Sequence, residues 1–210
     1  MLDSAGEGPS FRLLRMARIR LRKRGEVVER AAELGQAIQT ALERLETVGT
    51  TDQRAVDIVW QAEGLGTLLW ALGLGELELY DQPFEPEWVA WTPVEGGELR
   101  PREEIALAQE TARLWHWRAR TARLMAESGA KLPEQWRSFE QLVAAIAMRG
   151  FNEELLPPPL RGDFPAFGMP YRELPPARRA EALSIAYERH RALNWLCGEG
   201  ASWADTPTDT

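Results

Sequence analysis

The feature of this sequence that most constrains the fold is an apolar run from Ile58 to Leu74 in which Glu63 is the only charged residue. The run falls short of the roughly 20 residues that a membrane span needs. It therefore predicts a helix buried at the centre of a globular fold. Because an isolated buried carboxylate is costly, Glu63 must either pair with an arginine or hold a proton with a raised pKa.

The rest of the chain predicts further helices. Apolar residues recur at helical spacing between Val27 and Leu45, and proline at a first turn or glycine after a last turn marks several helix ends. About six helices are expected. Their ranges are Phe11 to Val48 with a break near Gly25, Asp52 to Leu72, Pro101 to Ser128, Pro133 to Met148, and Pro176 to Cys197.

Two segments lack such periodicity. Residues 76–99 are rich in proline and glycine and carry Trp88 and Trp91, and a proline-rich connection runs from Leu156 to Pro176. A connection of that length inside a compact domain is unusual, and its aromatic residues predict that it packs against the core. The predicted fold is all-α, a single-domain multi-helix bundle with a long proline-rich connection before the last helix. Residues 1–10 form a flexible N-terminus, and residues 11–210 form the helical domain.

Composition narrows the classes of function. The formal net charge of −7 disfavours nucleic acid and anionic membranes as main partners. Cys197 is the only cysteine, so neither an intramolecular disulfide nor a cysteine-based zinc cluster can form. Acidic Asp3 and Glu7 occupy an N-terminus that lacks an apolar signal-peptide core, which predicts a cytoplasmic protein. The sequence contains no phosphate-binding loop, no dinucleotide motif and no HExxH string, and we expect no cofactor and no metal.

Several stretches together resemble a bacterial family catalogued as domain of unknown function 4272. They are WQAEGL from Trp60 continuing to Gly73, GDF from Gly162 through Tyr171, ERHRALNWL from Glu188 to Leu196, and Trp203 with the closing Thr-Asp-Thr. The segment Glu26 to Ala31 is also similar. The family often has aspartate directly after the tryptophan, whereas this chain has Ala204 and then Asp205. The resemblance implies a helical single domain and no particular activity.

The candidate catalytic residues are Glu63 and His190, which would act as an acid–base pair across a cleft. A structural ion pair for Glu63 and a satisfied core position for His190 are the alternatives. The C-terminal tail is expected to dock through Trp203 and to bring Asp205 and Asp209 near Arg189 or Arg191. Candidate binding residues lie beside Glu63, on the last helix and in the tail: Trp60, Tyr187, Arg191, Asn194, Trp203 and Asp205.

Three hypotheses for function follow. The favoured one is a non-catalytic helical binding or protein-interaction module, with a protein or small-molecule partner and with Trp88 and Trp91 as anchors. The alternative is a small hydrolase or nucleotide-processing enzyme that uses Glu63 and His190, which requires those side chains within one hydrogen bond or one water of each other. The second alternative is nucleic-acid contact through a basic N-terminal helix at Arg12 to Arg24. Neither the oligomeric state nor the substrate follows from the sequence.

Overall fold

The computed structural model describes residues 19–126, 131–132 and 134–210, and it confirms the predicted all-α bundle. The helices are α2 (Arg24–Val48), α3 (Gln53–Val59), α4 (Ala62–Ala71), α5 (Pro86–Trp91), α6 (Arg102–Ala126), α7 (Phe139–Asn152) and α8 (Pro176–Leu196). Strands β1 (Pro165–Ala166) and β2 (Met169–Pro170) and the short 3-10 helix η1 (Tyr171–Glu173) lie between α7 and α8. The predicted flexible segment 1–10 lies outside the described residues. No described helix is long and apolar enough to cross a membrane.

Helix α2 begins at Arg24 after the non-helical residues 19–23, so the helical stretch is interrupted within one residue of the break predicted near Gly25, although Gly25 itself lies in the first turn of α2. The Glu26 carboxylate accepts a hydrogen bond from the backbone N–H of Lys23 at 2.9 Å, which caps the first turn and lets Gly25 continue the helix. The apolar stripe predicted for this segment is buried: Val27, Ala31, Leu34, Ile38 and Ala41. Residues 19–23, which were expected to be helical, lead into α2 without helical structure.

The helix predicted from Asp52 to Leu72 is two helices, α3 and α4, with a turn at Trp60 and Gln61 between them. Asp52 caps α3 as expected, because its side chain accepts from the N–H of Ala55 at 3.1 Å. Ala55 is the one buried residue of α3, whereas every residue of α4 is buried. The turn therefore separates α3, which lies at the surface, from α4, which lies at the centre of the fold.

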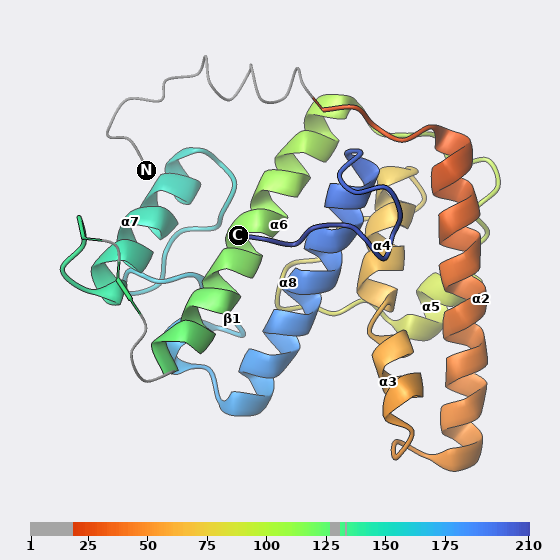
Figure 1. The fold of residues 1–210 in the computed structure, drawn as a ribbon, viewed down its shortest axis with the longest axis horizontal. Helices are drawn as coiled ribbons and strands as arrows, with labels where there is room; N and C mark the ends of the chain where they lie inside the picture. Colours follow the sequence, from red (N-terminus) through yellow and green to blue (C-terminus); the bar gives the residue numbers. More distant parts are fainter. Residues whose placement is uncertain (1–18, 127–130, 133) are drawn as a thin grey trace.

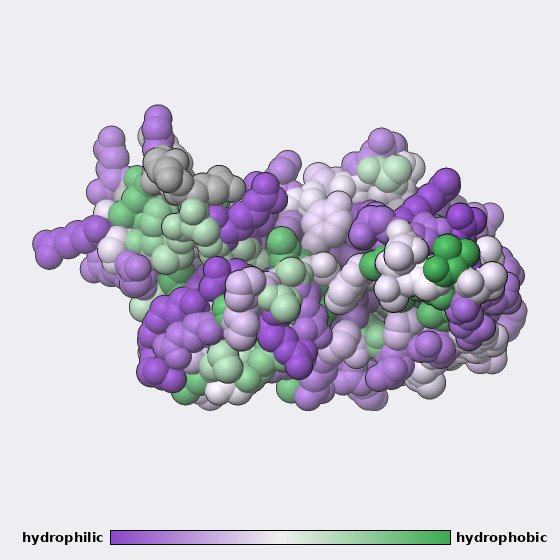
Figure 2. Space-filling view, turned by 90° about the horizontal axis from the view of Figure 1, so that it is seen from below, coloured by the Kyte–Doolittle hydropathy of each residue, from purple (hydrophilic) through white to green (hydrophobic). Residues whose placement is uncertain are grey.

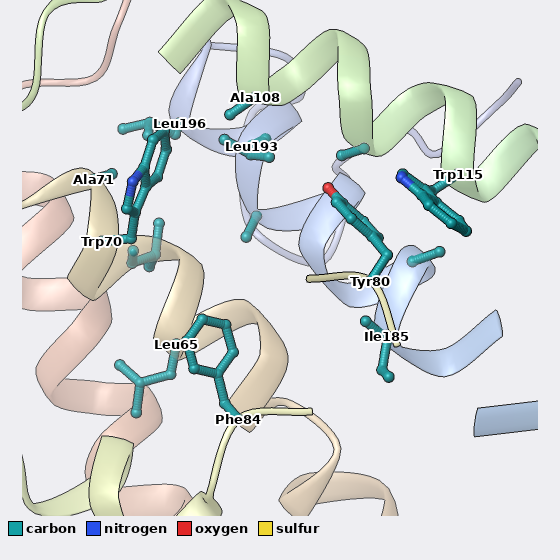
Figure 3. Packing of buried hydrophobic residues seen from close by; sticks show 14 of the residues in the cluster. Leu65, Trp70, Ala71, Tyr80, Phe84, Ala108, Trp115, Ile185, Leu193 and Leu196 are labelled. Carbon is teal, nitrogen blue, oxygen red and sulfur yellow. The ribbon is translucent and has the colours of Figure 1, made fainter. Parts of the chain in front are cut away.

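Helices α4, α6 and α8 form the centre of the molecule, with α6 and α8 side by side, α2 and α5 on the other side of α4, and α3 below α4 (Figure 1). The alanine stripe predicted on α6 is buried, so that α8 can approach closely. Tyr80 stacks on Trp115 with ring centroids 5.3 Å apart, in the core beside Leu193 (Figure 3). Gly66 gives Phe84 room, because a Cβ atom there would lie 2.5 Å from the Phe84 ring.

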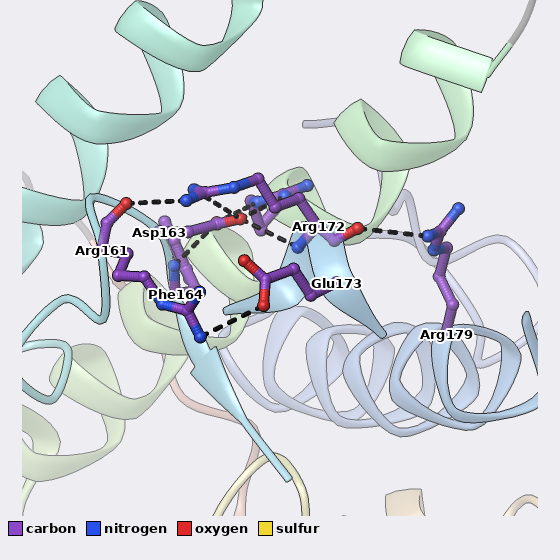
Figure 4. A network of polar contacts seen from close by, with 7 residues as sticks. Arg161, Asp163, Phe164, Arg172, Glu173 and Arg179 are labelled. Carbon is purple, nitrogen blue, oxygen red and sulfur yellow. Dashed lines mark hydrogen bonds and ion pairs between the residues drawn. The ribbon is translucent and has the colours of Figure 1, made fainter. Parts of the chain in front are cut away.

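The proline-rich connection packs down as predicted, around the buried carboxylate of Asp163. Arg118 on α6 donates to both carboxylate oxygens, at 2.7 and 2.8 Å, and the backbone N–H groups of Phe164 and Arg172 donate at 2.7 and 2.9 Å. Figure 4 shows Asp163 between Phe164 and Arg172. The connection also contains the hairpin of β1 and β2, which the sequence did not indicate.

Helix α7 departs from its prediction at both ends. It begins at Phe139 after a Ser138 cap, whose side chain accepts from the N–H of Gln141 at 3.2 Å, rather than at Pro133. Gly150 lies inside α7 instead of ending it, because the helix continues to Asn152. A Cβ atom at Gly150 would lie 2.4 Å from the Leu156 side chain, so this glycine permits close packing rather than chain reversal.

Candidate functional site

Glu63 forms a closed ion pair with Arg189. Its Oε2 atom accepts from Nε and Nη2 of Arg189, both at 2.8 Å, and its Oε1 atom accepts from the backbone N–H of Phe84 at 2.8 Å. Glu63 is 2% exposed and Arg189 is 0% exposed. Burial raises the pKa of Glu63, while the charge and hydrogen bonds of Arg189 oppose that shift. Of the two expectations for Glu63, the structural ion pair is the one that the structure contains.

The guanidinium of Arg189 also holds the chain that crosses α4. It donates to the carbonyl oxygens of Leu79 at 3.1 Å and Gln82 at 2.8 Å, and it lies over the rings of Tyr80 and Phe84 at 5.1 and 4.8 Å. The pair therefore joins α4, α8 and residues 78–84 into one unit. Its donors and acceptors are used within the protein, which leaves no group to act on a substrate.

Within the described residues, no hydrogen bond joins His190 to Glu63, and each has other partners. His190 Nδ1 instead lies 3.0 Å from Nδ1 of His116, and Asn194 Nδ2 lies 3.0 Å from His190 Nε2. Because an amide nitrogen donates, His190 Nε2 accepts, so His190 carries its proton on Nδ1 and donates it to His116. The pairing of the two histidines could not be read from the sequence, where they are 74 positions apart.

Burial keeps both imidazoles neutral. It lowers the pKa of His116 to about 4 and that of His190 to about 3, with further lowering of the latter by the neighbouring His116. Neutral, hydrogen-bonded rings in a closed core are a structural feature. They also fix the orientation of Asn194, whose Oδ1 accepts from Gln109 at 2.8 Å.

The C-terminal tail docks as predicted, although Asp205 has a different partner. Asn194 donates to the carbonyl oxygen of Pro207 at 2.8 Å, and buried Trp203 packs edge-on against Trp195 at 5.6 Å. Figure 1 shows the tail crossing α8 toward α6. The expected contact of Asp205 with Arg189 or Arg191 is wrong, since Asp205 accepts from the Ser202 hydroxyl at 2.7 Å. Asn194, Trp203 and Asp205 thus serve tail docking.

Two of the candidate binding residues, Trp60 and Tyr187, line one open pocket of about 210 Å³. Its other lining residues are Asp57, Ser184 and Glu188, which the sequence interpretation missed. Glu188 is 8% exposed, and its Oε2 accepts from Arg191 at 2.6 Å. Burial raises its pKa to about 7 against the opposing effect of Arg191. Arg191 therefore lies behind this pocket as the partner of Glu188.

The anchors expected for protein contact are exposed. Trp88 and Trp91 on α5 are 50% and 54% exposed, and Trp91 borders a shallow pocket of about 200 Å³ between α5 and α2. The face seen in Figure 2 is mostly hydrophilic, with hydrophobic residues on the side where α7 lies and smaller groups of them at the centre and the opposite end. Among the described residues, no group of three or more histidine, cysteine, aspartate or glutamate side chains could hold a metal ion.

The basic segment expected to contact nucleic acid lies largely outside the described residues. Of its described part, Arg22 donates to the carbonyl oxygens of Trp195 and Gly200, both at 2.9 Å. Arg24 donates to the carbonyl oxygen of Gly97 at 2.6 Å. Both arginines also pair with acids, Arg22 with Glu26 at 3.5 Å and Arg24 with Glu98 at 3.3 Å, which offsets the positive charge that they offer to phosphates.

Comparison of the chain with family models, curated proteins and solved structures found no match. The resemblance to the domain of unknown function 4272 stays a prediction.

Proposed function

We propose that this protein is a non-catalytic protein-interaction module whose binding surface is formed by residues 76–98. The observation that carries the proposal is the exposure of Trp88 and Trp91, which lie three positions apart and so share one face of α5. A buried tryptophan removes about 150–250 Å² of surface from water. Covering the exposed half of one ring thus contributes on the order of 2–3 kcal/mol. Tryptophan is also enriched among the residues that dominate binding energy at interfaces.

The charge of this surface specifies the chemistry of the partner. Residues 76–98 contain no lysine or arginine but seven acidic residues: Glu76, Glu78, Asp81, Glu85, Glu87, Glu95 and Glu98. Glu98 and Glu76 face Arg24 and Arg100, and Asp81 accepts from the N–H of Phe167. Exposed Glu85, Glu87 and Glu95 have no ion-pair partner within the described part of the chain. A protein surface with an apolar hollow rimmed by lysine and arginine complements this arrangement.

Helix α5, which carries Trp88 and Trp91, is held in place by its packing against the rest of the fold. Val89 and Ala90, on the opposite face of α5, are buried, and the Ala90 carbonyl oxygen accepts from Gln39 of α2 at 2.6 Å. Gly35 permits this approach, since a Cβ atom there would lie 3.2 Å from the same oxygen. The Trp88 ring lies against Gly75, where a Cβ atom would lie 2.9 Å from it. Anchors held in position before binding lose less conformational entropy on association.

We further propose that the protein works in the cytoplasm. Cys197 is a free, buried thiol, and burial raises its pKa to about 12, so it stays protonated and unreactive. A chain whose one cysteine is reduced suits a reducing compartment.

Site-specific photocrosslinking tests the interaction. A benzophenone amino acid replaces Trp91 in one variant and Val48 in the other, because both side chains are 54% exposed and Val48 lies at the end of α2, outside the 76–98 surface. After irradiation in cells, we expect a defined adduct from position 91 only, and purified partner should bind the unmodified protein less tightly as salt increases. A Trp88→Ser/Glu87→Gln variant should compete poorly for that partner. Equal adducts from both positions, or none from position 91, would refute the proposal.

A further inference from the structure

We infer that the pocket between α3 and α8 binds a small alkylammonium ion, with Trp60 and Tyr187 against its alkyl groups and Asp57 and Glu188 facing its charge. This site is separate from the proposed protein-binding surface and does not depend on it. The pocket volume of about 210 Å³ suits a ligand of the size of choline rather than a nucleotide.

The aromatic residues supply the first part of the argument. Trp60 and Tyr187 come from segments 127 positions apart, the C-terminal end of α3 and the middle of α8, and they line the same pocket. Tryptophan and tyrosine faces attract cations through the ring quadrupole, and aromatic residues gathered around a pocket are the usual means of binding methylated ammonium groups. Arg191 at 5.7 Å from the Tyr187 ring shows that this ring already accepts a cation on one side.

The acidic residues supply the second part. Glu188 is almost entirely removed from water, yet its one recorded hydrogen bond uses Oε2, toward Arg191. Its Oε1 atom has no hydrogen-bond partner within the described residues. It is also not one of their polar atoms that are buried without a partner, so it is accessible to solvent. Since Glu188 lines the pocket, this oxygen is the acceptor that a cation would meet. Asp57, held by Gln53 at 2.7 Å, adds a second negative charge at the exposed end.

A pocket lined by two carboxylates and two aromatic rings favours a cation over other small ligands. An anion would be repelled by Asp57 and Glu188, and a neutral alcohol of the same shape would leave Glu188 with Arg191 as its one counter-charge and would add none for Asp57. Binding of a cation favours the ionised form of Glu188, so the ion is expected to bind more tightly as pH increases through about 7, by up to about tenfold per pH unit below that value.

The experiment titrates the full-length protein with choline chloride and follows the tryptophan indole N–H signals by NMR. The Trp60 signal is assigned from a Trp60→Phe variant. We expect saturable shifts of that signal, and no saturation with 3,3-dimethylbutan-1-ol, the neutral analogue of choline. Trp60→Ala lacks this signal and is measured by titration calorimetry, where binding should weaken roughly 2- to 30-fold, as expected for one cation–π contact. Glu188→Gln, which keeps the side-chain volume, should weaken binding and remove its pH dependence.

Phe151→Ala serves as the control, because Phe151 is an exposed aromatic residue on α7, away from the pocket. Its affinity for choline should equal that of the unmodified chain. The inference fails if choline causes no saturable shift at millimolar concentrations, or if the neutral analogue binds as well. It also fails if Glu188→Gln, in a folded protein, binds choline with unchanged affinity and unchanged pH dependence.

Discussion

Replacing Arg189 with methionine leaves the Glu63 carboxylate in the centre of the fold with one remaining donor, the N–H of Phe84. The three hydrogen-bonded carbonyl groups of residues 78, 79 and 82 lose their common donor at the same time. Removing one partner of a buried ion pair typically costs about 3–5 kcal/mol. Because small domains unfold with a free energy of about 5–15 kcal/mol, this one change should remove a large part of the stability.

The loss should depend on pH in a defined direction. Without Arg189, the pKa of Glu63 in the folded state increases further above its unfolded value of 4.5. A raised folded pKa favours the folded state at low pH, and that advantage is lost as pH increases through the folded pKa. Arg189→Met should therefore destabilise the protein more at pH 8 than at pH 5.

Urea unfolding followed by circular dichroism measures both effects through the midpoint and slope of the transition. Arg178→Met is the matched control, since Arg178 pairs with Glu181 on the same helix at the surface and should cost less than about 1 kcal/mol. The double replacement Glu63→Met/Arg189→Met should recover part of the loss, because apolar side chains of similar size can replace a buried pair. If Arg189→Met costs no more than the control, the ion pair does not stabilise the fold as argued here.

Three further predictions concern other parts of the fold. Because the pKa values of His116 and His190 are lowered in the folded protein, unfolding takes up protons below the unfolded pKa of 6.5. The free energy of unfolding should therefore fall by up to about 2 kcal/mol per histidine between pH 6.5 and 5. The thermal unfolding of His116→Gln should depend less on pH. Gly66→Ala should cost about 1–3 kcal/mol in urea unfolding by displacing the Phe84 ring, whereas Gly25→Ala, with open space, should not destabilise. Trp203→Ala should cost about 3–5 kcal/mol and release the tail, which hydrogen exchange at Thr206 would detect.

Helix positions followed from the sequence where local signals and burial agreed. The apolar stripe of α2 and the alanine stripe of α6 have the period of a helix, and each is buried on the expected side. Predictions failed where tertiary contacts overrode local ones. Gly150 was interpreted as a helix end from residue type alone, yet it lies inside α7, and the turn at Trp60 and Gln61 has no glycine or proline to indicate it.

The sequence by itself determined that Glu63 would be buried and would either pair with a cation or hold a proton, because an unpaired ionised acid in an apolar core is costly. Only the tertiary structure decided that the partner is Arg189, 126 positions away, rather than His190, the residue that follows it. Neighbours on α8 point in directions that differ by about 100° per residue. Adjacent residues therefore serve different clusters, with Glu188 at the pocket, Arg189 in the core and His190 against α6, and this division depends on how the helices are rotated against one another.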